Sequence, residues 1–304
     1  MGDVVHALPA VTDMAKAVPG LQIDWLVEQS FSAIPAQHRA VQRVIPLQWR
    51  KWRKSLRTPE TRAALSHWRA EMQQHRYDLI IDMQGLLKSV GFACFANGPR
   101  AGYDWHSIRE PLASLFYQRR ARVPRDLHAV DRCRRLAAQV MGYPLPQTPP
   151  DFGLQRTDHP WQPAAAPYAV LIPCASRPEK LWPQADWIAV GRQLVRDGMA
   201  VAVMWGSPEE QLRAQDIAQA IGAAVPPFLT VAEAANTLAH AQIVVGLDTG
   251  LTHIAAAHGR TTVGIYCDHE PGLAGVTGSG RVKSLGGKGQ IPSLQAVLDA
   301  VAAH

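Results

Sequence analysis

The stretch GLDTGLTHIAAAHG at residues 246–259 combines residue types that bind phosphate groups. An apolar run ends at Asp248, Thr249 and Gly250 form a turn, and apolar residues at helical spacing follow. A helix N-terminus offers unpaired N–H groups and a partial positive charge, which suit an anion. His253 adds a side-chain donor, and Gly250 lets a ligand approach the backbone. The alternative is structural: Asp248 or Thr249 caps the helix, and His253 is merely exposed.

Two more loops follow predicted strands of the second half. Lys180, in PCASRPEKLWP, could neutralise a diphosphate leaving group, and the alternative is a solvated surface lysine. In WGSPEEQLRA, Ser207 and Glu210 have the spacing of a capping box, which would explain both residues structurally. The Glu210 carboxylate could instead hold a ribose diol, so the two roles compete for one side chain.

The basic stretch WRKWRKSLR at residues 49–57 predicts an amphipathic helix, with Trp49, Trp52 and Leu56 on one face and its arginines on another. Such a helix could dock on anionic lipid or hold an anionic acceptor. The alternative is a solvated face above two core-packed tryptophans.

In DWHSIREPLASLFYQRR, from residue 104, the residue types leave the role of the arginines open, and Glu110 could simply pair with one of them.

The chain opens MGDVVHALPAVTDMAKAVPG, whose apolar residues have helical spacing from the start. Asp3 is therefore a carboxylate at the first turn of a helix. A helix N-terminus stabilises the ionised form, so Asp3 would be a base available at neutral pH. The alternative is an N-cap.

Composition limits the class of protein. With 304 residues, 47% of them hydrophobic and 18% charged, the chain suits two globular domains. A net charge of +6 favours an anionic partner. The four cysteines are far apart, which suggests neither a zinc site nor a disulfide framework. The chain has no run of about 18 apolar residues and no signal-peptide pattern, so we expect a cytoplasmic protein.

Strand and helix patterns alternate in both halves, which predicts an α/β fold with parallel sheets. Residues 143–167 are rich in proline, have no period and form the best linker candidate. Two Rossmann-like domains facing a cleft are expected, with ligands outside the carboxyl ends of the strands. The predicted strands are 22–28, 77–85, 168–176, 199–206, 242–250 and 261–267, and the predicted helices are 86–96, 128–142, 181–198, 207–222 and 230–241.

Several pieces, in order, resemble the ADP-heptose:lipopolysaccharide heptosyltransferases of glycosyltransferase family 9. They are MGDVVHALPA, VIPLQWRKWRK, YDLIIDMQGLLKS, REPLASLFYQRR, EKLWP, WGSPEEQLRA and VGLDTGLTHIAAA. The piece REPLASLFYQRR is similar to the branch that adds the first heptose. The resemblance implies a GT-B fold, with an acceptor-binding domain at residues 1–155 and an ADP-heptose-binding domain at 156–304.

The implied reaction moves heptose, with inversion, from ADP-heptose to Kdo of Kdo2-lipid A in lipopolysaccharide inner-core synthesis. It implies no cofactor and no metal, and a peripheral place on the inner face of the cytoplasmic membrane. Asp3 would be the general base, and Lys180 would stabilise the leaving group. The implied donor-binding residues are Ser176, Lys180, Glu210, Leu229, Asp248, Thr249, Gly250 and His253. The implied acceptor-binding residues are Arg50, Lys51, Arg53, Lys54 and Arg109.

The sequence departs from the family at two places. Ala175-Ser176 stands where the family often has two threonines; Ser176 can replace one hydroxyl, but Ala175 has none to offer a phosphate. In the family a strand precedes the Met-Gly-Asp piece, and we expect this first strand of the N-terminal domain to be missing from the sequence given.

Three rival functions remain open. One is a family member that acts on an already heptosylated core, and another is a catalytically silent nucleotide- or lipid-binding protein. The third, a nucleic-acid binder, is suggested only by charge. No nucleic-acid-binding motif supports it, so we expect no nucleic-acid partner.

Overall fold

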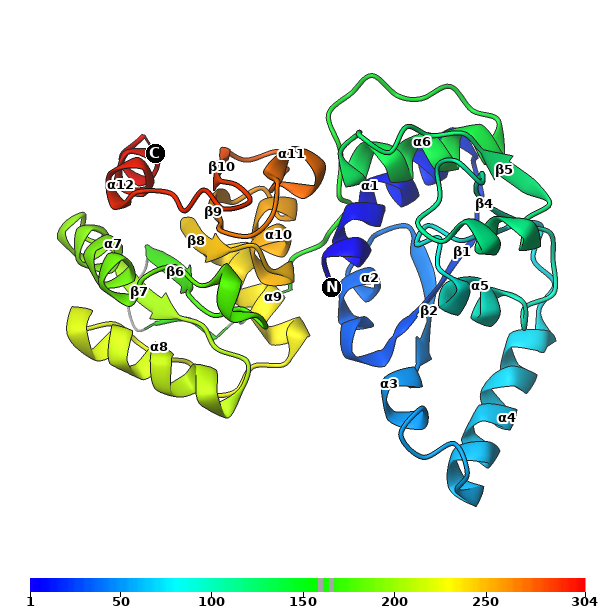
Figure 1. Ribbon diagram of the computed structural model, residues 1–304, viewed down its shortest axis with the longest axis horizontal. Helices are drawn as coiled ribbons and strands as arrows, with labels where there is room; N and C mark the ends of the chain where they lie inside the picture. The colour runs from blue at the N-terminus through cyan, green and yellow to red at the C-terminus, as the bar shows by residue number, and fades with distance from the viewer. Residues whose placement is uncertain (158–160, 164–166, 304) are drawn as a thin grey trace. The chain divides into compact units, whose positions relative to one another are not determined.

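The computed structural model describes residues 1–157, 161–163 and 167–303 of an α/β protein (Figure 1). The chain divides into two compact units. Unit 1 comprises Met1–Leu8, Ala33–Arg39 and Pro149–His304, and unit 2 comprises Pro9–Ser32 and Ala40–Thr148. Part of the predicted linker, residues 158–160 and 164–166, lies outside the described residues.

Unit 1 is built on a five-stranded parallel sheet with strand order β10-β9-β8-β6-β7. Its strands are β6 (Tyr168–Ile172), β7 (Ala200–Val203), β8 (Ile243–Leu247), β9 (Thr261–Tyr266) and β10 (Val282–Gly286). Its helices are the start of α1 (Gly2–Ala17), α2 (Ala33–Ala36), η3 (Pro178–Lys180), α7 (Gln184–Arg196), α8 (Pro208–Ile221), α9 (Val231–His240), α10 (Gly250–Ala257), α11 (Pro271–Ala274) and α12 (Leu294–Ala302). The strands and helices predicted for this half are confirmed, and β10 and α12 are additional to them.

Helices cover both faces of this sheet, as Figure 1 shows. Side chains of α7, α8 and α12 form one core with the sheet, where the rings of Trp182 and Trp187 meet edge to face 5.4 Å apart. Helices α9 and α10 pack together on the other face. Every residue of β6 and β8 is buried, as parallel strands covered on both faces require. The loops that follow these strands lie at the carboxyl edge of the sheet, which is where ligands bind in folds of this kind.

His258 follows α10 and is 7% exposed. Burial, assisted by the charges of Arg156, Arg260 and His240, lowers the pKa of His258 from 6.5 to about 4. Between these pH values the unfolded chain takes up a proton that the folded protein excludes. The stabilising effect of the neutral ring is therefore complete above pH 6.5 and is lost as the pH falls towards 4.

We expect His258→Phe to reduce the loss of unfolding free energy between pH 6.5 and 4, because phenylalanine does not titrate. Urea denaturation at several pH values would measure the slope. His269→Phe, at an exposed histidine, is the control and should leave the slope unchanged. Equal slopes in all three proteins would contradict the prediction.

Unit 2 contains two parallel sheets, one of β1 with β2 and one in the order β3-β4-β5. Its strands are β1 (Ile23–Glu28), β2 (Val41–Leu47), β3 (Ile80–Ile81), β4 (Arg100–Tyr103) and β5 (Arg119–Ala121). Its helices are η1 (Gln29–Phe31), α3 (Trp49–Trp52), α4 (Pro59–Gln74), α5 (Leu87–Ala93), η2 (Pro111–Phe116), α6 (Ala129–Met141) and the remainder of α1 (Gly2–Ala17). The strand predicted at 77–85 keeps only two residues as strand. Within the described ranges, no helix is long and apolar enough to cross a membrane.

A buried ion pair joins α1 to α6 in unit 2. Arg134 Nε lies 2.7 Å from Asp13 Oδ2, and the two side chains are only 6% and 4% exposed. The guanidinium also donates to the carbonyl oxygen of Pro146 at 3.2 Å. Because both charges are out of water, each depends on the other for its stabilisation.

Arg134→Met should lower the free energy of unfolding by about 3–5 kcal/mol, since it leaves the Asp13 carboxylate buried without its cation. Arg135→Met is a matched control on the exposed face of the same helix and should cost less than about 0.5 kcal/mol. Urea denaturation would compare them. A cost for Arg134→Met no larger than for Arg135→Met would show that the pair does not stabilise α1 on α6.

Candidate active site

Lys180 and Asp248 come together at the carboxyl edge of the unit 1 sheet. Lys180 ends η3, which follows β6, and Asp248 directly follows the neighbouring strand β8. The Lys180 ammonium donates to Asp248 Oδ2 at 2.5 Å and to the Asp248 carbonyl oxygen at 3.2 Å. The lysine side chain is 19% exposed. The alternative of a solvated surface lysine is therefore wrong.

His253 is the third member of this cluster. Its Nε2 lies 3.5 Å from Asp248 Oδ1, and the residue is 5% exposed. Burial by itself would raise the pKa of the Asp248 carboxyl, but hydrogen bonds from His253 and Lys180, together with the lysine charge, hold that pKa well below its usual range. The carboxylate is thus ionised at neutral pH and fixes both donors. The alternative of a merely exposed His253 is wrong.

The turn from β8 into α10 has the predicted form. Thr249 is the N-cap residue, with extended backbone and no side-chain cap bond, and α10 begins at Gly250. The Thr252 hydroxyl donates to the Leu247 carbonyl oxygen at 2.6 Å and so closes the turn internally. The N-terminus of α10 therefore lies at the carboxyl edge of the sheet, and a helix N-terminus suits a diphosphate. The Met1 side chain packs against Gly250 there.

The start of α1 belongs to the same unit. The ring of His6 meets the ring of His253 edge to face at 4.7 Å between centroids. Asp3 is in the first turn of α1, exposed, one turn before His6. His6 was not predicted from the sequence, where its only signal is its place one helical turn after Gly2-Asp3.

The other donor-binding candidates lie in the loop after β6, at the start of α8 and in the loop between α8 and α9. Ser176 is exposed in the loop after β6. The Ser207 hydroxyl accepts from Glu210 N–H at 3.3 Å, so Ser207 caps α8. The Glu210 carboxylate does not complete a capping box and instead accepts from Gly206 N–H at 2.8 Å. Leu229 is half-buried in the loop before α9.

The helix predicted at residues 49–57 is wrong beyond Trp52, because α3 ends there after four residues. The chain then turns: the Thr58 hydroxyl donates to the Ser55 carbonyl oxygen and caps α4, which starts at Pro59. Trp52 is 4% exposed and meets Trp68 edge to face, so the core-packed alternative describes the tryptophans. The candidate acceptor-binding residues of this stretch are exposed in unit 2 and are Arg50, Lys51, Arg53 and Lys54.

Arg109 is exposed in unit 2, just before η2. Its neighbour Glu110 accepts from Leu87 N–H at 2.6 Å and thus holds the start of α5. Arg119 and Arg120 donate to backbone carbonyl oxygens, at Val140 and at Ser114 and Tyr117 respectively.

A buried carboxylate missed by the sequence analysis organises the same region. Asp82 accepts from Ser89 Oγ and from the Tyr117 hydroxyl, both at 2.7 Å. It also accepts from Gln84 N–H at 2.9 Å. These bonds fix the turn between β3 and α5. The available signal was an aspartate, with a glycine three positions later, at the end of an apolar run.

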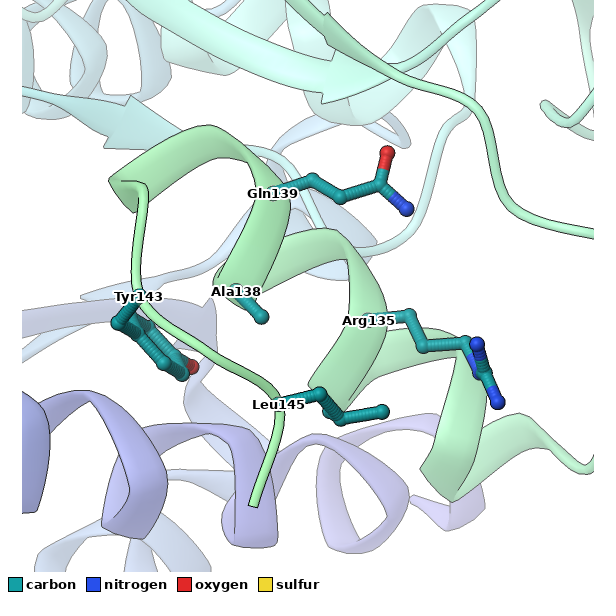
Figure 2. Close-up of a pocket in the computed structure, with 5 residues that line it drawn as sticks. All are labelled: Arg135, Ala138, Gln139, Tyr143 and Leu145. Carbon is teal, nitrogen blue, oxygen red and sulfur yellow. The ribbon is translucent and has the colours of Figure 1, made fainter. Parts of the chain in front are cut away.

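A separate pocket of about 150 Å³ lies in unit 2 on the surface of α6 (Figure 2). It is lined by Arg135, Ala138, Gln139, Tyr143 and Leu145. None of the candidate site residues lines it, so it is not part of the site described above.

Comparison with known proteins gives the class of this α/β protein. The model for "Glycosyltransferase family 9 (heptosyltransferase)" matches residues 64–295. Lipopolysaccharide heptosyltransferase 1 of Salmonella typhimurium strain LT2 is 40% identical over 285 residues, covering 93% of this chain and 90% of that protein. Structures of E. coli heptosyltransferase WaaC with ADP and with ADP-2-deoxy-2-fluoro heptose superpose with TM-scores of 0.91 and 0.89, at 37% and 36% identity. Each covers 100% of this chain and 96% of the other.

The protein is a glycosyltransferase with the GT-B fold. It belongs to glycosyltransferase family 9, the heptosyltransferases. The family and fold class predicted from the sequence are thereby confirmed.

Proposed function

We propose that this protein transfers heptose, with inversion, from ADP-heptose to Kdo of Kdo2-lipid A during lipopolysaccharide inner-core synthesis. The observation that carries the proposal is the Lys180–Asp248–His253 cluster beside the N-terminus of α10, in which His253 is buried and the other two are partly buried. This cluster occurs in a chain 40% identical to a protein named lipopolysaccharide heptosyltransferase 1.

On the donor side, Lys180 stabilises the negative charge that develops on the ADP diphosphate as its bond to heptose breaks. Thr249, Gly250 and His253 contact the diphosphate and sugar, and Asp248 holds Lys180 and His253 in place. Ser176 supplies one hydroxyl to a phosphate. Glu210 binds the ribose diol, and the backbone at Leu229 contacts adenine.

On the acceptor side, Asp3 removes the proton of the attacking Kdo hydroxyl. One base and one stabilised leaving group suffice for direct displacement with inversion, so no carboxylate nucleophile is needed. Acidic groups of the acceptor are bound by Arg50, Lys51, Arg53, Lys54 and Arg109.

The proposal includes the organisation and location of the protein. Residues 1–155 form the acceptor-binding domain and residues 156–304 the donor-binding domain, although residues 1–8, 33–39 and 149–155 group with unit 1. The protein is cytoplasmic and associates peripherally with the inner face of the membrane, where its lipid acceptor lies.

Incubation with ADP-heptose and Kdo2-lipid A, followed by mass spectrometry, tests the function. The expected product carries one added heptose. A parallel reaction with an already heptosylated acceptor tests the first rival, and product only there would replace the proposal. ADP binding without any product would favour the silent binding protein.

A further inference from the structure

Unit 2 exposes a group of large apolar side chains on neighbouring elements. Eleven such side chains are exposed among the described residues, and five of them fall between residues 87 and 116. The five are Leu87, Trp105, Leu112, Leu115 and Phe116. Exposed apolar residues are common singly, whereas a contiguous group usually marks a binding surface.

The geometry of η2 accounts for three of them. Residues three apart eclipse in a 3-10 helix, so Leu112 and Leu115 lie along one edge, 55% and 60% exposed. Ala113 and Ser114 are buried beneath them against the sheet. Phe116, at the end of η2, is 46% exposed. The buried small residues fix η2, and its large apolar residues are left outside.

Leu87 lies beside this helix. Its N–H donates to the Glu110 carboxylate at 2.6 Å, and Glu110 N–H donates to the Gly85 carbonyl oxygen at 3.3 Å. Helices α5 and η2 consequently pack side by side. We call Leu87, Leu112, Leu115 and Phe116 the apolar face.

The segment that contains η2 is rich in cations. Residues 100–125 contain six arginines but only two acidic residues. Leu87 and Glu110 form the hydrogen bond that joins the two helices. Their sequence neighbours Lys88 and Arg109 are both exposed. Apolar residues flanked by Arg and Lys fit an anionic lipid surface, because the side chains enter the interface while the cations meet the headgroups.

We propose that the apolar face docks the protein on an anionic phospholipid bilayer. This deepens the proposed function, in which the acceptor is a membrane lipid. The lipid-docking role that the sequence suggested for residues 49–57 is weakened, because Trp52 is in the core and Trp49 packs against it, which leaves only Leu56 of the apolar side exposed. A second copy of this chain suits the face poorly, because the arginines of both copies would meet.

The test uses the full chain and sedimentation with vesicles of phosphatidylethanolamine and phosphatidylglycerol, compared with phosphatidylcholine alone. The triple variant Leu112→Ser, Leu115→Ser and Phe116→Ser should bind the anionic vesicles about tenfold or more weakly. The matched control replaces Leu212, Leu273 and Ile291, which are exposed in unit 1, by serine and should bind normally. Thermal unfolding checks that both variants are folded.

Equal binding of the triple variant and the unaltered protein would overturn the inference, as would failure of the unaltered protein to prefer anionic vesicles. Transfer to Kdo2-lipid A in detergent micelles separates this from the proposed function. If the unaltered protein makes no product but the vesicle results hold, the proposed function fails and the docking surface stands. If the triple variant binds vesicles normally but transfers poorly in micelles, the face holds the acyl chains of the acceptor, and the bilayer assignment is wrong.

Discussion

Asp3→Asn should lower the rate of heptose transfer about 10²–10⁴-fold and leave the affinity for ADP nearly unchanged. Asparagine keeps the size of the side chain but cannot accept the proton of the acceptor hydroxyl. The measurements are the initial rate with saturating ADP-heptose and the Kd of ADP by calorimetry. The effect should be largest on kcat, because the proton moves only in the transition state.

Asp131→Asn is the matched control, since Asp131 is also an exposed acid in the first turn of a helix. It should transfer heptose at the rate of the unaltered protein. If Asp3→Asn weakened ADP binding as much as turnover, Asp3 would be structural and another base would be required.

Lys180→Met should reduce heptose transfer about 10²–10³-fold, because a single preorganised donor to a developing charge has an effect of that size. ADP binding should weaken as well, since the proposed contact between the ammonium and the diphosphate would exist in both ground and transition states. Lys283→Met, at an exposed lysine of β10 in the same unit, is the control and should have little effect. A Lys180→Met protein that binds ADP normally and keeps its turnover would remove Lys180 from the mechanism.

The second half of the fold was predictable because its signals are local. Gly222 ends α8 in the left-handed conformation, Ser207 caps the same helix, and β8 is a continuous apolar run. Each of these features depends on residues a few positions apart. The alternation of such elements then limits the topology to parallel sheets covered by helices.

The basic stretch shows where local reasoning fails. The tryptophans and arginines of this stretch do have helical spacing. Thr58-Pro59 is a stronger local signal than this spacing, and it starts a new helix, α4. The sequence analysis did not predict α4, whose apolar residues are few. The burial of Trp52 against Trp68 is a tertiary contact that periodicity could not reveal.

The candidate residues of the site could be chosen from the sequence, but the contacts between them could not be predicted. The residues were chosen at the ends of strands, and parallel topology brings those ends to one edge. The pairing of Lys180 with Asp248 joins residues 68 positions apart, and nothing in either loop indicates it. The ring contact between His253 and His6 likewise joins residues far apart in the sequence.

The Lys180–Asp248 bond has a consequence for product release. Lys180 has an anionic partner within its own protein, Asp248. If Lys180 binds the diphosphate as proposed, the diphosphate replaces this carboxylate as the partner of the ammonium. When ADP leaves, the ion pair between Asp248 and the ammonium can form again. This competition lowers the affinity of the site for ADP, the product, and so favours its release. ADP should therefore dissociate more slowly from Asp248→Asn than from the unaltered protein in a stopped-flow experiment, and an equal or faster rate would contradict this. On this view Asp248 acts as a built-in counter-ion that keeps the site reusable from one turnover to the next.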